Sequence, residues 1–89
     1  MDPINELRIL MINSPEKIVI GSKKTIKYLK LAKIGKVFLS KNVPEDIKSD
    51  IEYYSKLSNV EVIQLDLSNE ELGSILKKPF KVAVVSVLK

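Results

Sequence analysis

The sequence predicts an α/β fold in which a largely parallel or mixed sheet lies between layers of helices. Apolar runs typical of strands alternate along the 89 residues with segments of helical periodicity. The last run, 82–88, is apolar without alternation, which is typical of a central strand covered on both faces. We therefore expect residues 1–89 to form a single domain built from alternating strands and helices.

Cap and turn residues set the limits of the elements in the first half of the chain. Asp2 before Pro3 supplies an N-cap followed by a first-turn proline. Gly35 is placed to stop the second helix at about residue 33. The expected elements are a helix over 3–13, a strand over 17–20, a helix from about 23 to 33 and a strand over 36–40.

The second half of the chain continues this alternation. Pro44 starts a third helix, and Ser58 and Asn59 end it. Ser68 and Glu71 have the spacing of a capping box at the start of a short fourth helix. The expected elements are a helix over 44–57, a half-buried alternating strand over 60–65, a helix over 69–76 and the apolar strand over 82–88.

Composition excludes several classes of chemistry. The chain has no cysteine and no histidine, which excludes disulfides, thiolate chemistry, imidazole bases and ordinary structural zinc sites. Paired acids at 45–46 and 70–71 fall in first helical turns, where the helix macrodipole explains them. We expect no catalytic residues, no metal site and no cofactor. Because no apolar run approaches the roughly 20 residues that cross a bilayer, we expect a cytoplasmic protein without membrane contact.

Charges are sorted along the chain. Residues 17–41 contain eight lysines and no acid, whereas residues 42–71 contain eight acids against two lysines. After residue 71 only lysines occur, and the net charge is +4. If the two basic segments meet in space, their combined field attracts a polyanion in a salt-dependent way.

The segment 21–27, Gly-Ser-Lys-Lys-Thr-Ile-Lys, predicts a basic helix N-terminus directly after a strand. Backbone N–H groups in a first helical turn lack intrahelical partners, so they bind anions. A second such strand end lies at 41–44, and the lysines of 77–81 join the same sheet edge if the last strand runs the required way. With only three glycines, the chain lacks the glycine framework of a P-loop or a dinucleotide fingerprint.

Five segments, in order over about residues 4–88, resemble a known family. They are 21–27, Asn-Val-Pro at 42–44, Asp-Ile-Glu-Tyr-Tyr-Ser-Lys-Leu at 50–57, Glu-Leu-Gly at 71–73 and Phe-Lys-Val-Ala-Val-Val-Ser at 80–86. They are similar to the thirty-e protein of the archaeal and eukaryotic large ribosomal subunit, within the kink-turn-binding superfamily that includes the seven-Ae protein. The resemblance implies a three-layer α/β/α sandwich with a four-stranded mixed sheet. It also implies a non-enzymatic protein that binds a kink-turn in ribosomal RNA.

The resemblance further implies which residues contact the RNA. Gly21 would let the RNA backbone approach, Asn42 would bond a base edge, and Phe80 would pack against a flipped-out nucleotide. The remaining contacts are basic or polar side chains on the helix after Gly21, with Lys48 and Lys81 at the RNA backbone. The full set is Gly21, Ser22, Lys23, Lys24, Lys27, Asn42, Lys48, Phe80 and Lys81. Thr25 lies on the packed side of the helical wheel.

Each of the three leading residues has a purely structural explanation as well. Gly21 could serve a tight turn, Asn42 could cap the helix that begins at Pro44, and Phe80 could belong to the core. One departure from the family concerns the loop before Phe80, where Lys77 replaces a usual glycine.

Two other functions remain open at this point. One is a kink-turn-binding protein of another ribonucleoprotein, with a guide RNA or the RNase P RNA as partner. The other is a small phosphometabolite- or nucleotide-binding enzyme subunit, which the same helix N-terminus would suit. The partners implied by the resemblance are ribosomal RNA and neighbouring ribosomal proteins, and we expect the isolated chain to be a monomer.

Overall fold

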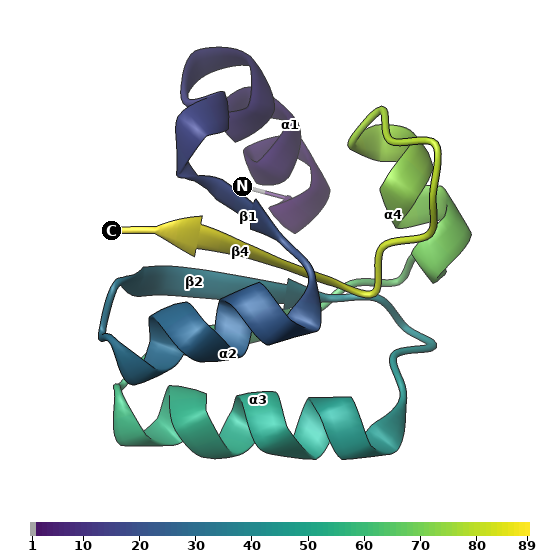
Figure 1. Cartoon of the computed structure of the whole chain (residues 1–89). Coiled ribbons are helices and arrows are strands. Elements are labelled where there is room, and N and C mark those ends of the chain that lie inside the picture. Colours follow the sequence, from purple (N-terminus) through teal and green to yellow (C-terminus); the bar gives the residue numbers. More distant parts are fainter. Residues whose placement is uncertain (1) are drawn as a thin grey trace.

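The computed structural model forms three layers and describes residues 2–89, so Met1 of the expected domain lies outside the described residues. Figure 1 shows helices on both faces of a sheet. One face carries α1 (Pro3–Asn13) and α4 (Asn69–Ile75), and the other carries α2 (Ser22–Lys30) and α3 (Glu45–Leu57). The strands are β1 (Ile18–Ile20), β2 (Ile34–Leu39), β3 (Glu61–Gln64) and β4 (Val84–Leu88). The predicted α/β/α sandwich with a four-stranded mixed sheet is confirmed. No helix within residues 2–89 combines the length and the apolar character needed to cross a membrane.

The sheet has the order β1-β4-β2-β3. Strand β4 pairs antiparallel with both of its neighbours, whereas β2 and β3 pair in parallel. The expected central position of the last apolar run is thus confirmed, and four consecutive residues, 84–87, are buried. Because β4 runs opposite to β1 and β2, its start lies at the edge where those two strands end.

Alternating side chains of the inner strands divide between two hydrophobic clusters. Phe38 and Val85 pack with Leu7 and the α4 leucines on one face. Val37 and Val84 pack with α2 and α3 on the other face. A strand buried on both faces needs apolar residues at consecutive positions, which is why β4 shows no polar alternation.

The exception within β4 is Ser86, whose hydroxyl forms a buried hydrogen bond with the hydroxyl of Thr25 at 2.9 Å. Both side chains are completely buried. The bond joins α2 to the central strand and fixes the helix whose first turn carries the basic cluster. Thr25 therefore lies on the packed side of α2, as the helical wheel predicts.

Several predicted boundaries are wrong, among them those of the second strand, which spans Ile34–Leu39 and not 36–40. At the end of α2 and the start of β4, a hydrogen bond replaces the expected one. Helix α2 ends at Lys30 and not near residue 33, while Gly35 lies inside β2. Ala32 adopts φ +57°, and the N–H of Lys33 bonds the carbonyl of Tyr28 at 2.9 Å, which closes the helix.

Two further differences concern strand starts. Lys17 belongs to a short 3₁₀ turn, Pro15–Lys17, so β1 starts one residue later than expected. Strand β4 starts at Val84 because the N–H of Val82 bonds the carbonyl of Asn69 in α4 at 3.0 Å and is not available to the sheet.

We predict that Ser86→Ala lowers the free energy of unfolding by about 1–3 kcal/mol, because the buried Thr25 hydroxyl loses its partner. The double variant Thr25→Val/Ser86→Ala should lose less than Ser86→Ala alone. Urea unfolding followed by circular dichroism measures both, with Ser49→Ala on the exposed side of α3 as the control. Equal losses in the single and double variants would contradict the assignment of a hydrogen bond here.

Candidate nucleic-acid interface

Loops from three strands meet at one edge of the sheet, at the right of Figure 1. The N–H of Gly21, after β1, bonds the carbonyl of Val84 at 2.9 Å. The N–H of Ser40, after β2, bonds the carbonyl of Ala83 at 2.9 Å. The antiparallel direction of β4 thus places the loop 77–83 beside the ends of β1 and β2. The lysines of 77–81 therefore lie at the same edge of the sheet as the start of α2, which the sequence left dependent on the direction of the last strand.

A groove of about 430 Å³ lies between the start of α2 and the loop that leads into β4. Its apolar wall comes from strand ends and from Ile47 of α3, and its charged side chains are Lys24, Lys78 and Lys81. The other lining residues are Ile20, Gly21, Ser22, Phe80, Val82, Ala83 and Val84. The two basic segments of the chain therefore meet here, because Lys24 comes from the first and Lys78 and Lys81 come from the second.

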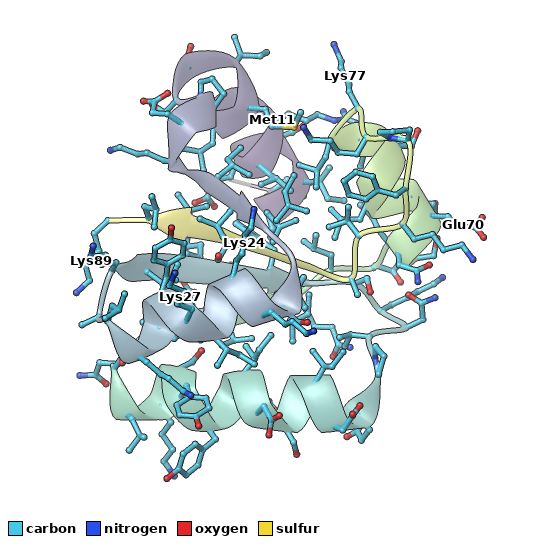
Figure 2. All side chains as sticks on the ribbon, viewed as in Figure 1. Met11, Lys24, Lys27, Glu70, Lys77 and Lys89 are labelled. Carbon is cyan, nitrogen blue, oxygen red and sulfur yellow. The ribbon has the colours of Figure 1, made fainter. Side chains whose placement is uncertain are left out.

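The basic character continues from this groove along α2. Figure 2 shows Lys24 and Lys27 extending from the exposed side of that helix. Both line a neighbouring groove of about 410 Å³ beside β1, with Tyr28. The Lys27 ammonium lies 6.0 Å from the centre of the Tyr28 ring. Lys24 is common to both grooves, so a surface rich in lysine runs from the loop edge along the side of the sheet, with Glu16 as the one acid among the residues that line the second groove.

Gly21 precedes α2 with φ +110°, a conformation that other residues rarely adopt. A Cβ at this position would have no neighbour within 4 Å. The backbone conformation is therefore what requires glycine within the protein, and the space in front of it is open. The start of α2 beside the groove is therefore not covered at Gly21, and the first N–H groups of the helix have no intrahelical partner.

Phe80 is 55% exposed although it is aromatic, so it is not part of the core. Its loop lies directly on α4, because the N–H of Lys78 bonds the carbonyl of Gly73 at 3.0 Å. A Cβ at Gly73 would collide with the carbonyl oxygen of Phe80. The loop begins at Lys77, which adopts φ +57°. Helix α4 therefore holds the exposed ring in place through backbone contact.

Asn42 does not cap α3, whose N-cap residue is Pro44. Its side chain instead bonds Asn69 at the start of α4. The Asn42 oxygen accepts the backbone N–H of Asn69 at 2.9 Å, and its amide nitrogen donates to Asn69 Oδ1 at 3.2 Å. Asn42 remains exposed and lies on the loop after β2.

The other predicted site residues differ in their distance from the groove. Ser22 lines it, and Lys23 is exposed one residue further along the same turn. Lys48 lies elsewhere, since its ammonium donates to Gln64 Oε1 of β3 at 3.3 Å. Lys81 pairs with Glu70 at 3.4 Å, but both side chains are well exposed and the pair is weak.

A capping box forms the start of α4. The Ser68 hydroxyl accepts the N–H of Glu71 at 3.2 Å, and the Ser68 N–H donates to Glu71 Oε1 at 3.0 Å. The pKa of the Glu71 carboxyl lies below its usual range, mainly because of this second bond and to a smaller extent because of the hydrogen bond with the Ser68 side chain. The predicted capping box is confirmed, and it fixes the helix end to which Asn42 is attached.

Sequence reasoning missed three residues that shape this surface. Lys78 had a visible signal, because it lies in a basic stretch two residues before Phe80. Asn69 and Gly73 had none, because their contacts join residues that are distant in sequence or depend on how the loop crosses α4.

The sequence model of the ribosomal protein L7Ae/L30e/S12e/Gadd45 family matches residues 6–89. The chain belongs to this family. The resemblance drawn from the five segments is thereby confirmed at the level of the family.

Several relatives are archaeal proteins named large ribosomal subunit protein eL30. The protein of Methanocaldococcus jannaschii is 44% identical over 72 residues, which cover 81% of this chain and 66% of the relative. The protein of Methanothermobacter thermautotrophicus is 46% identical over 70 residues, covering 79% and 71%. The protein of Sulfurisphaera tokodaii is 39% identical over 84 residues, covering 94% and 77%. The chain thus spans just under two thirds of the first relative's length and somewhat more of the other two.

A solved structure supports the fold. A protein of unknown function from Bacillus halodurans C superimposes with a TM-score of 0.82, covering 100% of this chain and 87% of that one. The two sequences are only 16% identical, so the likeness concerns the fold alone.

We predict that Gly73→Ala lowers the free energy of unfolding by about 1–3 kcal/mol, because the added methyl group displaces the Phe80 backbone. Urea unfolding measures the loss. Ser74→Ala, at the next and exposed position of α4, is the control and should not lose stability. A Gly73→Ala variant as stable as the wild type would show that the loop does not rest on α4 as described.

Glu71 makes stability depend on pH. Because its pKa is lowered in the folded state, its contribution is present above the ordinary carboxyl pKa and is lost as the pH falls through the lowered value. Glu71→Gln keeps an acceptor oxygen but does not titrate. We therefore expect the stability advantage of the wild type over Glu71→Gln to shrink on acidification.

Chemical unfolding from neutral pH to about pH 3 tests this expectation. Glu70→Gln, whose side chain lies in the same helical turn but takes no part in the capping box, is the control. A difference between wild type and Glu71→Gln that stays constant with pH would contradict the capping interaction.

Proposed function

We propose that this chain is a protein of the large ribosomal subunit that binds ribosomal RNA at a kink-turn. The observation that carries the proposal is the groove that joins the exposed Phe80 ring to Lys24, Lys78 and Lys81. The names of the archaeal relatives support the ribosomal assignment. Residues 1–89 would then act as a single, non-enzymatic RNA-binding domain.

Under this proposal the lysines and the start of α2 bind the phosphate backbone. Lys23, Lys24 and Lys27 lie within the first turns of α2, where the helix dipole already favours an anion. Gly21 leaves the approach to these N–H groups open. Phosphate contacts of this kind position the RNA and make its affinity depend on salt.

The apolar part of the groove suits an unstacked nucleotide. Bases that leave a helix are commonly held against aromatic side chains, and Phe80 offers an exposed ring above an apolar wall. A kink-turn presents such a nucleotide beside a sharply bent backbone, so it can meet both the ring and the lysines. A straight duplex offers the phosphates but not the free base.

The distribution of charge favours an extended polyanion over a phosphometabolite. Lys24 is shared by two grooves, and Lys27 lies in the second of them, away from Phe80. A small phosphorylated molecule would contact only one end of this surface, whereas an RNA backbone can follow its whole length.

The proposal places the chain in the cytoplasm as part of the ribosome, in contact with ribosomal RNA and neighbouring ribosomal proteins. The isolated chain is proposed to be a monomer. Lys48, which bonds Gln64 in the free protein, would reach the RNA backbone only after leaving that partner.

Filter binding to a kink-turn RNA and to a straight duplex tests the proposal. We expect tighter binding to the kink-turn RNA, and with about five neutralised phosphates a log–log salt slope of about −4 to −5. Phe80→Ala should weaken kink-turn binding by about 5- to 150-fold, because a base loses its stacking partner. Lys23→Ala should reduce the magnitude of the salt slope by about 1.

Matched variants separate these effects from general loss of charge or aromatic surface. Lys33→Ala removes an exposed lysine beyond the far end of α2, and Tyr53→Ala removes an exposed ring from α3. Neither variant should lose the preference for the kink-turn. Equal binding of the wild type to both RNAs would overturn the kink-turn assignment, and a flat salt response would argue against an RNA role.

A further inference from the structure

Asn69 holds together the two loops that flank the proposed RNA site. Its backbone N–H and its side-chain oxygen both bond the side chain of Asn42, at 2.9 and 3.2 Å. Its carbonyl accepts the N–H of Val82, at the end of the loop that carries Phe80, at 3.0 Å. One residue at the start of α4 therefore connects the loop after β2 with the loop before β4.

The contact with the backbone of Asn69 sets the orientation of the Asn42 amide. A backbone N–H can only donate, so the atom of Asn42 that faces it must be the oxygen. The amide nitrogen then faces Asn69 Oδ1 and donates one of its two hydrogens there. Its second N–H has no partner among the hydrogen bonds of the described residues, and it belongs to an exposed side chain.

The side chain of Asn69 is not needed to start α4. The capping box of Ser68 and Glu71 already occupies the N-cap, and Asn69 is the first residue after it. Within residues 2–89, the hydrogen bond that engages Asn69 Oδ1 is the one from Asn42. An asparagine side chain at this position therefore acts on Asn42 and not on the helix.

We propose that Asn69 is a positioning residue of the RNA site, which orients the Asn42 amide so that its remaining N–H donates to an acceptor on an RNA base. This inference rests on the proposed function and deepens it. Asn69 does not touch the RNA. It removes the rotational freedom of the Asn42 amide before binding, so that less freedom is lost when the base edge is bound. The flip that would present an acceptor in place of a donor is already prevented by the backbone N–H of Asn69, and the Asn69 side chain adds the second bond that limits rotation of the amide.

A double-variant cycle with Asn42→Ala and Asn69→Ala tests the proposal, using the kink-turn and straight RNAs. We expect Asn69→Ala to weaken kink-turn binding by about 2- to 10-fold, the effect of one neutral hydrogen bond. In a protein that already carries Asn42→Ala, the change Asn69→Ala should have almost no further effect on kink-turn affinity, because the amide that Asn69 orients is absent. The contrary result is that the affinity losses of the two single variants simply add, while the wild type still prefers the kink-turn RNA. That result would overturn the positioning role and leave the RNA function intact.

Asn69→Asp provides the conservative variant. It keeps an acceptor oxygen and suits the first turn of a helix, although its charge repels RNA in general. The quantity to compare is therefore the loss of kink-turn affinity that Asn42→Ala causes, measured in the wild type, in Asn69→Asp and in Asn69→Ala. The general repulsion cancels, because both proteins of each pair carry it. That loss should be the same in Asn69→Asp as in the wild type and much smaller in Asn69→Ala. Ser74→Ala, on the exposed part of α4, is the control and should leave the loss unchanged.

A measurement on the free protein separates this inference from the RNA function. We expect the nuclear magnetic resonance order parameter of the Asn42 side-chain amide to fall in Asn69→Ala and to be retained in Asn69→Asp. An unchanged order parameter in Asn69→Ala overturns the proposal, whatever RNA is bound. Equal binding of the wild type to both RNAs overturns the proposed function and this inference with it.

Discussion

The central, antiparallel position of β4 in the sheet fixes which loops meet at the groove. It is the central strand that bonds both β1 and β2, and it runs antiparallel to each. Its start must therefore lie where β1 and β2 end, and this brings residues 21–24, 40–42 and 78–83 to one edge. Had β4 run parallel to its neighbours, the lysines before it would lie at the opposite edge from α2's first turn.

Burial on both faces of the sheet leaves that edge as the place where polar groups can gather. Most side chains of the inner strands belong to the two hydrophobic clusters, and the buried Ser86 hydroxyl bonds that of Thr25. The groove consequently combines apolar strand ends with lysines from the adjoining loops. This combination suits a ligand that carries both flat apolar rings and phosphates, as an unstacked nucleotide within an RNA chain does.

Helix α4 acts as the support for this edge although it is only seven residues long. Its start bonds Asn42 through Asn69, its middle contacts the Phe80 backbone at Gly73, and its end turns at Lys77 into the Phe80 loop. The capping box gives it a fixed beginning. The two side chains proposed to contact bases, Asn42 and Phe80, are thus both held by the same short helix.

Local sequence patterns predicted the fold class, the order of the helices and strands, and the buried side of α2. These follow from periodicity and from caps such as Asp2 and Ser68–Glu71, which act within a few residues. The sequence also identified the basic start of α2, whereas the exposure of Phe80 came from the structure, because the residues alone left a place in the core open. The sequence placed the end of α2 wrongly, because Ala32 closes the helix at positive φ without being a residue that marks such a turn.

Which of these residues lie close together depends on the three-dimensional fold. Asn42 and Asn69 are 27 positions apart, and their pairing depends on strand order, strand direction and the way α4 packs on the sheet. The same holds for Lys24 with Lys78 and for Lys48, which the fold directs to Gln64 and away from the groove. Such contacts depend on how segments that are distant in sequence pack against one another, and local sequence patterns do not determine that packing.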